Sequence, residues 1–467
     1  MGSIALFIGR KQELQELSKL YETGKFQCVI VYGRRRIGKT SLITEFSKDK
    51  ETIFFTGQET SAKENLESLS NSIFMISEEF SSASPMFSSY NEALEAVFDV
   101  AENRRVVFVI DEYPYLAASY KGISSLLQVY IDKYKDSSKL FLILCGSSLS
   151  FMENQVLGYQ SPLYGRRTAQ FKIQSFNFEH AIEFYSNCYS TRDIALLYGV
   201  TGGVPLYMSL MDSNLSAIDN IKEKFLTPSA YLYEEPGNLI KQEFREPAQY
   251  NAIIKSIANG ASRLSEIAVK VGLETALCSA YISKLISIGI IKKDFPFREE
   301  TSKKTVYRID DSMFRFWYRF IPGVMPLIER RETDLSFKRI EPHISAFLGP
   351  VFEDICKQYL WHQNIADKLP FSFHDAGRWW GNNPKKREQC EIDIIADDKE
   401  NAIFSECKWT NDVMKYSNLE KLIENSEFFK YSKKYYYLFS KSGFSEELQQ
   451  LSEEKNNIKL LHFDNMF

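Results

Sequence analysis

A glycine-rich segment near the start of the sequence carries residue types that bind phosphate. Residues 33–40 read Gly-Arg-Arg-Arg-Ile-Gly-Lys-Thr and fit the pattern G-x-x-x-x-G-K-[ST]. Backbone N–H groups of such a loop surround the β-phosphate, and the N-terminus of the following helix adds positive potential. The lysine can pair with the β- and γ-phosphates, and the threonine hydroxyl can bind Mg²⁺. The segment therefore predicts an ATP site, whose candidate binding residues are Gly33, Arg34, Arg35, Arg36, Ile37, Gly38, Lys39, Thr40 and Ser41.

Two acidic residues follow a second apolar run and could complete this site. Residues 106–110 form a continuous β-branched and aromatic run, typical of a buried parallel strand, which ends at Asp111 and Glu112. Ligands of parallel sheets bind at the carboxyl ends of the strands, so both side chains should lie near the phosphate loop. We expect Asp111 to hold Mg²⁺ through its water shell and Glu112 to polarise the attacking water.

A third apolar run, at 139–145, leads to Ser147 and Ser148. A polar side chain there could orient the water beside the γ-phosphate, and we assign this role to Ser148; a turn or a helix cap is the alternative.

Further along, Arg166 and Arg167 follow a glycine. A guanidinium aimed at a γ-phosphate would stabilise transition-state charge, but a surface basic pair explains the same spacing.

A second set of residues suited to chemistry lies near the carboxyl end, where Asp393, Glu406 and Lys408 form the pattern D…E-x-K. Two residues apart on a strand, Glu406 and Lys408 share a face, and a hairpin over 391–409 would bring Asp393 beside them. An expected helix adds Glu353. Carboxylates on one face would hold Mg²⁺, and the lysine could position water or neutralise developing charge. The alternative is an amphipathic hairpin whose charges face water.

The elements that must position these residues suggest an α/β protein of several domains. A length of 467 residues allows about three domains. Strand and helix patterns alternate through residues 1–235, which predicts a parallel-sheet domain with a helical lid. Residues 236–325 hold three helical segments and two strands, the order of a winged helix-turn-helix. Residues 326–467 are expected to form a second α/β domain.

The sequence leaves DNA contact by this middle region open. The third helix, at 275–288, could enter the major groove while lysines 292–293 contact phosphates, yet this helix carries only Lys284 as a basic residue. A rigid lid or a surface for a protein partner is the alternative. The basic run at 385–387 could meet a phosphate backbone or form a solvated loop.

Composition limits the remaining classes. A net charge of −4 gives no overall nucleic-acid signature, so a DNA contact would need a local basic patch. The seven cysteines are scattered and never spaced C-x-x-C, which argues against a zinc site or a disulfide framework. No apolar run is long enough for a membrane span, and residues 1–7 do not resemble a signal peptide. We therefore expect a cytoplasmic protein that has no membrane partner.

A series of ordered segments resembles the archaeal-type ATPase family, which belongs with the AAA+/STAND P-loop ATPases. These segments are residues 7–14, 33–40, 109–114, 145–148, 163–168 and 201–205. The resemblance implies that Gly9 and Arg10 lie near the adenine and that Ser147 or Ser148 acts as a sensor. It also implies that Arg166 and Arg167 are candidate arginine fingers. Pro205 would open a lid helix that faces the nucleotide.

The carboxyl-terminal region resembles the nuclease-like domain fused to many ATPases of this family, including Gly-Arg-Trp-Trp-Gly at 377–381. Its pattern is similar to the PD-(D/E)XK fold, although Ile392 stands where that pattern has proline. The resemblance implies Asp393, Glu406 and Lys408 as the core site. Glu353 would be the helical carboxylate.

Together these patterns predict an enzyme that binds and hydrolyses ATP with Mg²⁺ and whose nucleotide state controls a Mg²⁺-dependent, nuclease-like domain. DNA is the expected partner besides ATP and ADP, and a homo-oligomer or a protein partner is possible. Two alternatives stay open: a regulatory STAND-type ATPase whose carboxyl-terminal domain binds DNA or protein without cutting, and a toxin or defence effector.

Overall fold

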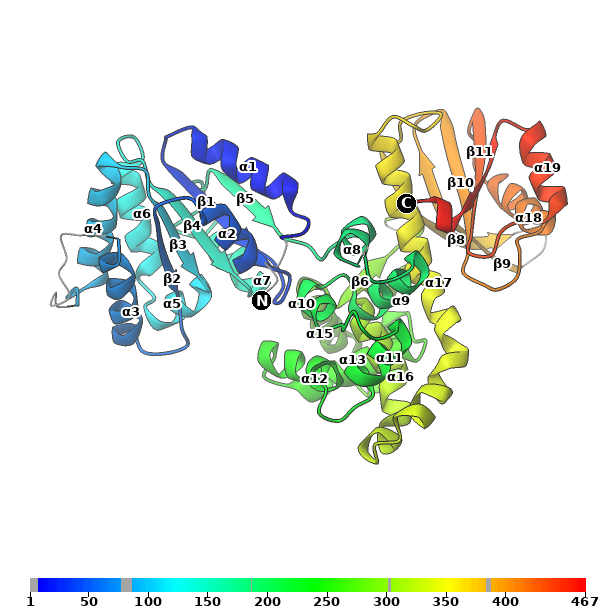
Figure 1. Ribbon diagram of the computed structural model, residues 1–467, viewed down its shortest axis with the longest axis horizontal. Helices are drawn as coiled ribbons and strands as arrows, with labels where there is room; N and C mark the ends of the chain where they lie inside the picture. Colours follow the sequence, from blue (N-terminus) through cyan, green and yellow to red (C-terminus); the bar gives the residue numbers. More distant parts are fainter. Residues whose placement is uncertain (1–6, 77–85, 186, 301–303, 384–387) are drawn as a thin grey trace. The chain divides into compact units, whose positions relative to one another are not determined.

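The computed structural model describes residues 7–76, 86–185, 187–300, 304–383 and 388–467 (Figure 1). The chain divides into two units: residues 1–175 with 204–206, and residues 176–203 with 207–467. The domain boundaries predicted near residues 235 and 325 both fall inside the second unit. The basic run at 385–387 lies outside the described residues. Among the residues described, no helix combines the length and the apolar character needed to cross a bilayer.

A parallel five-stranded sheet, in the order β2-β3-β4-β1-β5, organises the first unit. Every residue of β1, β3 and β4 is buried, which explains why their sequences are continuous apolar runs. The prediction of a parallel α/β domain is confirmed; β2 and β5 were not anticipated individually. The strands are β1 (Gln27–Tyr32), β2 (Thr52–Thr56), β3 (Val107–Asp111), β4 (Phe141–Gly146) and β5 (Ala169–Lys172).

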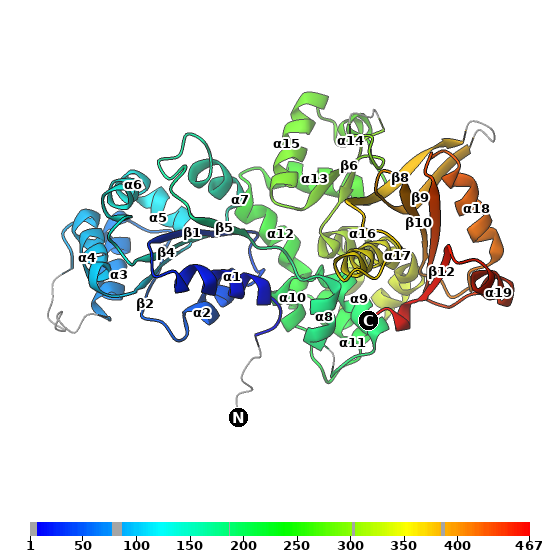
Figure 2. The same ribbon diagram turned by 90° about the horizontal axis from the view of Figure 1, so that it is seen from above.

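Helices cover both faces of this sheet (Figure 2). On one face, α1 (Lys11–Glu22) and α2 (Lys39–Ser47) bury Leu17 and Phe46 against the sheet. The other face packs against four helices, followed by short α7 (Leu149–Phe151) and a π-helical turn (Met152–Val156). These four are α3 (Ala62–Phe74), α4 (Tyr90–Asn103), α5 (Tyr113–Ser119) and α6 (Ile123–Tyr134).

The second unit begins with helices that pack on two long ones, α16 (Ser312–Glu329) and α17 (Thr333–Ile365). The aromatic residues of α16 pack on α17: Phe316 contacts Phe347, with ring centroids 5.5 Å apart. The leading helices are α8 (Phe178–Tyr185), α9 (Thr191–Thr201), α10 (Pro205–Ser209; residues 205–206 belong to the first unit), α11 (Ala217–Phe225) and α12 (Tyr231–Glu243).

Three helices and an antiparallel hairpin follow in the order that the sequence suggested. The hairpin pairs β6 (Ile291–Asp294) with β7 (Val306–Ile309). The helices are α13 (Pro247–Ala258), α14 (Leu264–Val271) and α15 (Thr275–Ser287).

A mixed five-stranded sheet, in the order β12-β11-β10-β9-β8, closes the second unit. The antiparallel pairing of β9 with β10 confirms the hairpin expected around 391–409. β10, β11 and β12 are parallel, and α18 and α19 connect them. The elements are β8 (Asp375–Asn383), β9 (Glu388–Asp397), β10 (Asn401–Lys408), α18 (Tyr416–Ser426), β11 (Lys433–Ser440), α19 (Glu446–Glu454), β12 (Ile458–His462) and a 3₁₀ turn (Phe463–Asn465).

The loop after β6 reaches into this sheet. Phe297 is buried in the sheet's own apolar core, and its backbone N–H donates to the carbonyl of Arg378 at 2.8 Å. A Cβ at Gly377 would lie 2.9 Å from the ring of Phe297, so the close approach requires glycine there. Arg298 adds an ion pair with the buried carboxylate of Asp397 at 2.6 Å. The hairpin and the sheet therefore share one core.

Candidate functional site

The phosphate loop connects β1 to α2, and two of its glycines are required by geometry. At Gly33, φ is +153°, and a Cβ would overlap the carbonyl oxygen of Ile173 and lie 2.6 Å from Cδ1 of Ile37. Gly38 adopts the left-handed conformation, φ +84°, at the N-cap of α2. The glycine spacing read from the sequence thus corresponds to backbone conformations that other residues adopt poorly.

Lys39 is held within the loop by its own backbone. The side chain is buried, and Nζ donates to the carbonyl oxygen of Arg34 at 2.9 Å. Burial lowers the pKa of the Lys39 ammonium, although nearby Cys145 and Glu112 act in the opposite direction. Because charge-assisted hydrogen bonds to phosphate are stronger than those to a neutral carbonyl, a phosphate would compete well for this ammonium.

Thr40 and Asp111 meet at the carboxyl end of the sheet, as predicted. The hydroxyl of Thr40 donates to Oδ2 of Asp111 at 2.9 Å, and Asp111 is buried at the end of β3. Magnesium at phosphate sites takes oxygen from one or two protein groups and the rest from phosphates and water. This pair therefore fits Mg²⁺ without a third protein ligand.

Glu112 is fixed by Ser147, not by Ser148. The hydroxyl of Ser147 donates to Oε2 of Glu112 at 2.9 Å, and Glu112 occupies the left-handed region with φ +48°. Ser148 begins α7 without a side-chain cap bond. The turn after β4 therefore directs Ser147 to the carboxylate, and the catalytic role assigned to Ser148 from the sequence stays a prediction.

Two segments distant in sequence reach the phosphate loop. Arg10 follows Gly9, both with positive φ, and its Nη2 donates to the carbonyl of Ile37 at 3.3 Å. Leu206 N–H donates to the carbonyl of Arg36 at 3.4 Å. That bond brings Pro205 to Gly38, where an added Cβ would lie 4.0 Å from its Cγ. One contact was not anticipated: Arg35 donates to the hydroxyl of Tyr115 at 2.8 Å.

Arg166 and Arg167 lie toward the amino ends of the strands, whereas the phosphate loop lies at their carboxyl ends. They precede β5, and Thr168 N–H bonds the carbonyl of Cys28 near the start of β1, whereas the phosphate loop follows the end of β1. That six-residue strand spans about 17 Å. Arg166 is committed to Asp132 by two bonds, of 2.9 and 2.6 Å. The structure therefore does not bring Arg166 to the phosphate loop of its own domain.

In the second unit, Asp393, Glu406 and Lys408 come together on β9 and β10. Asp393 is buried and accepts the backbone N–H of Cys407 at 2.8 Å. Burial raises the pKa of Asp393 well above its usual value, and the charges of Glu406 and Glu353 raise it further. Lys408 Nζ pairs with Oε1 of Glu406 at 2.5 Å.

Glu353 joins the group from α17. Burial raises the pKa of its carboxyl group, while Arg378 opposes the rise from 4.0 Å away. Arg378 also pairs with Glu391 at 2.5 Å. The part of the chain that the structure describes contains no group of three acidic, histidine or cysteine side chains able to hold a metal. Asp393 and Glu353 still offer the oxygen ligands that Mg²⁺ prefers.

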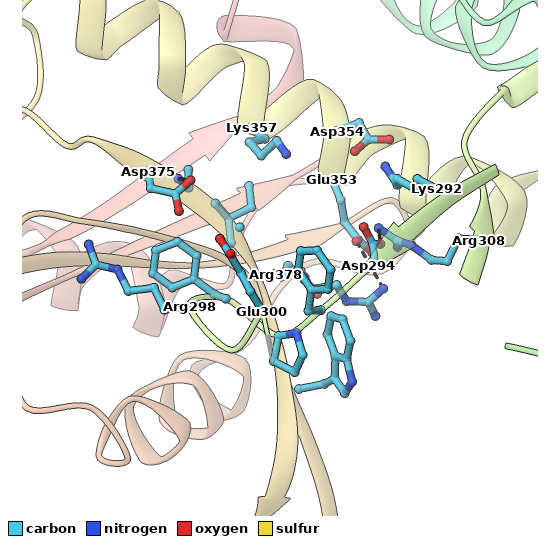
Figure 3. A pocket seen from close by; sticks show the side chains of 18 residues that line it. Lys292, Asp294, Arg298, Glu300, Arg308, Glu353, Asp354, Lys357, Asp375 and Arg378 are labelled. Atoms are coloured by element: carbon cyan, nitrogen blue, oxygen red, sulfur yellow. Dashed lines mark hydrogen bonds and ion pairs between the residues drawn. The ribbon is translucent and has the colours of Figure 1, made fainter. Parts of the chain in front are cut away.

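A cavity of about 310 Å³ opens beside Asp393 and Glu353 (Figure 3). The hairpin forms one wall, and α17, β8 and β9 form the others. Lys292 of the hairpin, for which the sequence left contact with a DNA backbone open, lines this cavity and pairs with Asp310 at 2.8 Å. Arg308 and Arg378 also line it and were not anticipated, because their elements meet only in the folded chain.

Comparisons with known proteins identify two regions. Residues 7–211 match the family described as an ATPase domain predominantly from Archaea. Residues 317–422 match a family of archaeal and bacterial proteins of unknown function. The chain therefore carries an ATPase domain, followed by a region whose family description assigns no activity.

Similar proteins agree with the family match. An uncharacterized protein of Methanocaldococcus jannaschii is 31% identical over 407 residues, which cover 86% of this chain and 88% of that protein. An uncharacterized ATP-binding protein of the same organism is 43% identical over 51 residues, covering 11% of this chain and 86% of that protein. The Walker-type ATPase of Pyrococcus abyssi shares the fold, with a TM-score of 0.51 and 20% identity over 67% of this chain and 96% of its own.

Proposed function

Because this chain belongs to the family of ATPases whose domain is found predominantly in archaea, we propose that it hydrolyses ATP with Mg²⁺ and that its nucleotide state controls a nuclease-like domain. The observation that supports hydrolysis most directly is the set of contacts at the carboxyl end of the first sheet. Thr40 meets Asp111 there, and Ser147 meets Glu112.

Each residue of this set has a distinct part in the proposed reaction. Lys39 exchanges its carbonyl partner for the β- and γ-phosphates. Thr40 and Asp111 would hold Mg²⁺, which neutralises the charge that develops on the phosphates. Glu112 accepts a proton from, or orients, the water that attacks the γ-phosphate, and Ser147 keeps its carboxylate in one rotamer.

In the second unit, the proposed site for nucleic acid is the face that carries Asp393, Glu353, Glu406 and Lys408. Support comes from buried Asp393 and half-buried Glu353: the charge of Glu353 raises the pKa of Asp393, and such pairs occur where a cation or a proton transfer is needed. The three helices and the β6–β7 hairpin would serve as a winged helix. Mg²⁺ bound at Asp393 and Glu353 would polarise a phosphate of the nucleic acid and activate a water molecule for attack.

A cleavage assay tests this proposal. The full chain is incubated with plasmid DNA or single-stranded DNA and Mg²⁺, with and without ATP, in wild-type form and as Glu406→Ala. Glu420→Ala, which removes an exposed glutamate of α18, is the matched control. We expect cleavage by the wild type and by the control, little cleavage by Glu406→Ala, and a changed rate when ATP is replaced by ADP. Equal cleavage by Glu406→Ala and the wild type would reject the nuclease site.

One observation favours a second candidate, a regulatory ATPase whose carboxyl-terminal domain binds without cutting. In the described residues, Glu406 is paired with Lys408, and no three potential ligands gather around one point. This candidate predicts ATP hydrolysis and DNA or protein binding that Glu406→Ala leaves intact, with no cleavage under any condition.

A further inference from the structure

The cavity between the β6–β7 hairpin and the carboxyl-terminal sheet has the composition of a nucleotide site. We propose that it binds one nucleotide, with its phosphate on the cations of the hairpin and β8 and its base against the aromatic wall. The nucleotide is either free or the end of a nucleic-acid strand. Binding itself does not depend on the proposed nuclease-like function; only the cleavage of a bound strand rests on it.

Cations from separate elements converge at one end of the cavity. Figure 3 shows Lys292 and Arg308 of the hairpin around the same end as Glu353, with Arg378 between the walls. Arg308 pairs with Asp294, and Arg378 pairs with Glu391. The wall carries five cationic and six acidic side chains, so phosphate binding here would depend on the arrangement of the cations and not on an excess of positive charge.

Some donors of this cluster lack an acceptor. In the described residues, the Nε atoms of Arg308 and Arg378 are buried without a hydrogen-bond partner. Lys357 of α17, which also lines the cavity, makes no ion pair among these residues. Unmatched buried donors cost free energy, and a phosphate with several acceptor oxygens is the ligand that a small shift of these side chains would satisfy.

Aromatic side chains supply a surface for a base. Phe295 and Trp380 line the cavity and are only half-buried. The indole N–H of Trp380 donates to the carbonyl of Lys304 at 3.3 Å, which holds the ring in place. Bases stack on such rings irrespective of sequence. Phosphate-binding cations and stacking rings in one cavity favour a nucleotide over inorganic phosphate.

Size and closure favour a single nucleotide over a duplex. A volume of about 310 Å³ lies at the lower limit of small-ligand pockets, which run from about 300 to 1,000 Å³. The hairpin cannot easily open this wall, because Phe297 is part of the sheet's core and Arg298 is paired with buried Asp397. A strand would therefore enter by its end, next to Asp393 and Glu353.

Binding in the presence of EDTA tests the proposal apart from cleavage. Two fluorescent single-stranded oligonucleotides serve as probes, one phosphorylated at the 5′ end and one at the 3′ end. Fluorescence anisotropy reports the affinity of each for the full chain. We expect Lys292→Gln and Arg308→Gln to weaken binding about tenfold or more, because each removes a charged donor. Lys293→Gln is the control, since its side chain is exposed on the other face of the same strand, and it should change affinity less than about twofold.

Competitors identify the source of the nucleotide. Displacement of the probe by a nucleoside monophosphate supports a free nucleotide. Displacement by linear but not circular single-stranded DNA supports a strand end. Circular DNA that competes as well as linear DNA, or equal losses in Lys292→Gln and Lys293→Gln, would overturn the proposal.

Two further measurements keep the outcomes separate. Arg308→Lys, which retains the charge, should bind better than Arg308→Gln, whereas a fold defect would affect both variants in thermal melts. Cleavage that depends on Glu406 without any effect of Lys292→Gln on binding would reject this site and leave the proposed function intact. Binding that depends on Lys292, without any cleavage, would support this nucleotide site and reject the proposed nuclease activity.

Discussion

The hydroxyl of Ser147 donates to the carboxylate of Glu112 at 2.9 Å and so links the ends of two neighbouring strands, β3 and β4. Without this bond the carboxylate can turn away from the attacking water. We expect Ser147→Ala to lower kcat for ATP hydrolysis about tenfold, less than the roughly 10²–10⁴-fold that a general base itself contributes, and to leave ATP affinity nearly unchanged. Steady-state assays check this. Ser148→Ala should behave as the wild type, and the opposite ranking of the two variants would refute the assignment.

Gly33 leaves no room for a side chain. Gly33→Ala would press a methyl group onto the carbonyl of Ile173, and overpacking of this kind costs about 1–3 kcal/mol. We expect a lower melting temperature and loss of ATP binding in calorimetry. In the control, Gly237→Ala on α12, the added methyl group has open space and should preserve both properties. Unchanged ATP affinity in Gly33→Ala would show that the loop tolerates a different conformation.

Arg166 is expected to stabilise its own domain instead of acting on its nucleotide. Arg166→Ala removes the partly exposed ion pair with Asp132 and should lower the free energy of unfolding by about 0.5–1 kcal/mol. Turnover measured in dilute protein should stay close to that of the wild type. An arginine finger would instead change turnover by about 10³-fold or more. A loss of that size in dilute Arg166→Ala would mean that the guanidinium reaches the site after all.

Arg298, in the loop after β6, pairs with buried Asp397, and this carboxyl group should make the free energy of unfolding depend on pH. Burial raises the pKa of Asp397, although Tyr431 and Arg298 oppose the rise. The folded chain therefore keeps this proton to higher pH than the unfolded chain, and the free energy of unfolding falls as pH rises above the unfolded pKa. Arg298→Ala should raise the pKa of Asp397 further and deepen this fall.

We expect Arg298→Ala to cost about 1–2 kcal/mol near neutral pH, a modest value because Arg298 is half exposed, and little below pH ~3.8, where Asp397 is protonated in both states. Urea unfolding across this pH range measures it. Lys368→Ala, which removes an exposed lysine, serves as the control. An equal loss at both ends of the range would exclude Asp397 as the cause.

What the sequence could predict was local. The pattern over 33–40, the apolar run before Asp111 and the two-residue spacing of Glu406 and Lys408 each depend on neighbouring residues, and the structure places them as expected. The choice between Ser147 and Ser148 depended on a turn whose direction adjacent residues do not determine.

The remaining features depend on residues far apart in the chain. Arg166 finds its partner 34 positions earlier, and no spacing rule indicates that pair. The strand pattern around Lys292 gave no sign of the second sheet beside it, so DNA contact by this lysine was left open. The cavity exists only because the hairpin and β8 meet, which is a tertiary event that single-sequence patterns do not encode.

The burial of Phe297 against Gly377 limits how this architecture could have been assembled from parts. A carboxyl-terminal fragment that starts at residue 326 would expose a hole the size of a phenylalanine ring. A foreign hairpin without that ring would leave the same gap. Recombination that replaced the last sheet would therefore have to carry the hairpin with it, although the helices α16 and α17 separate the two in the chain.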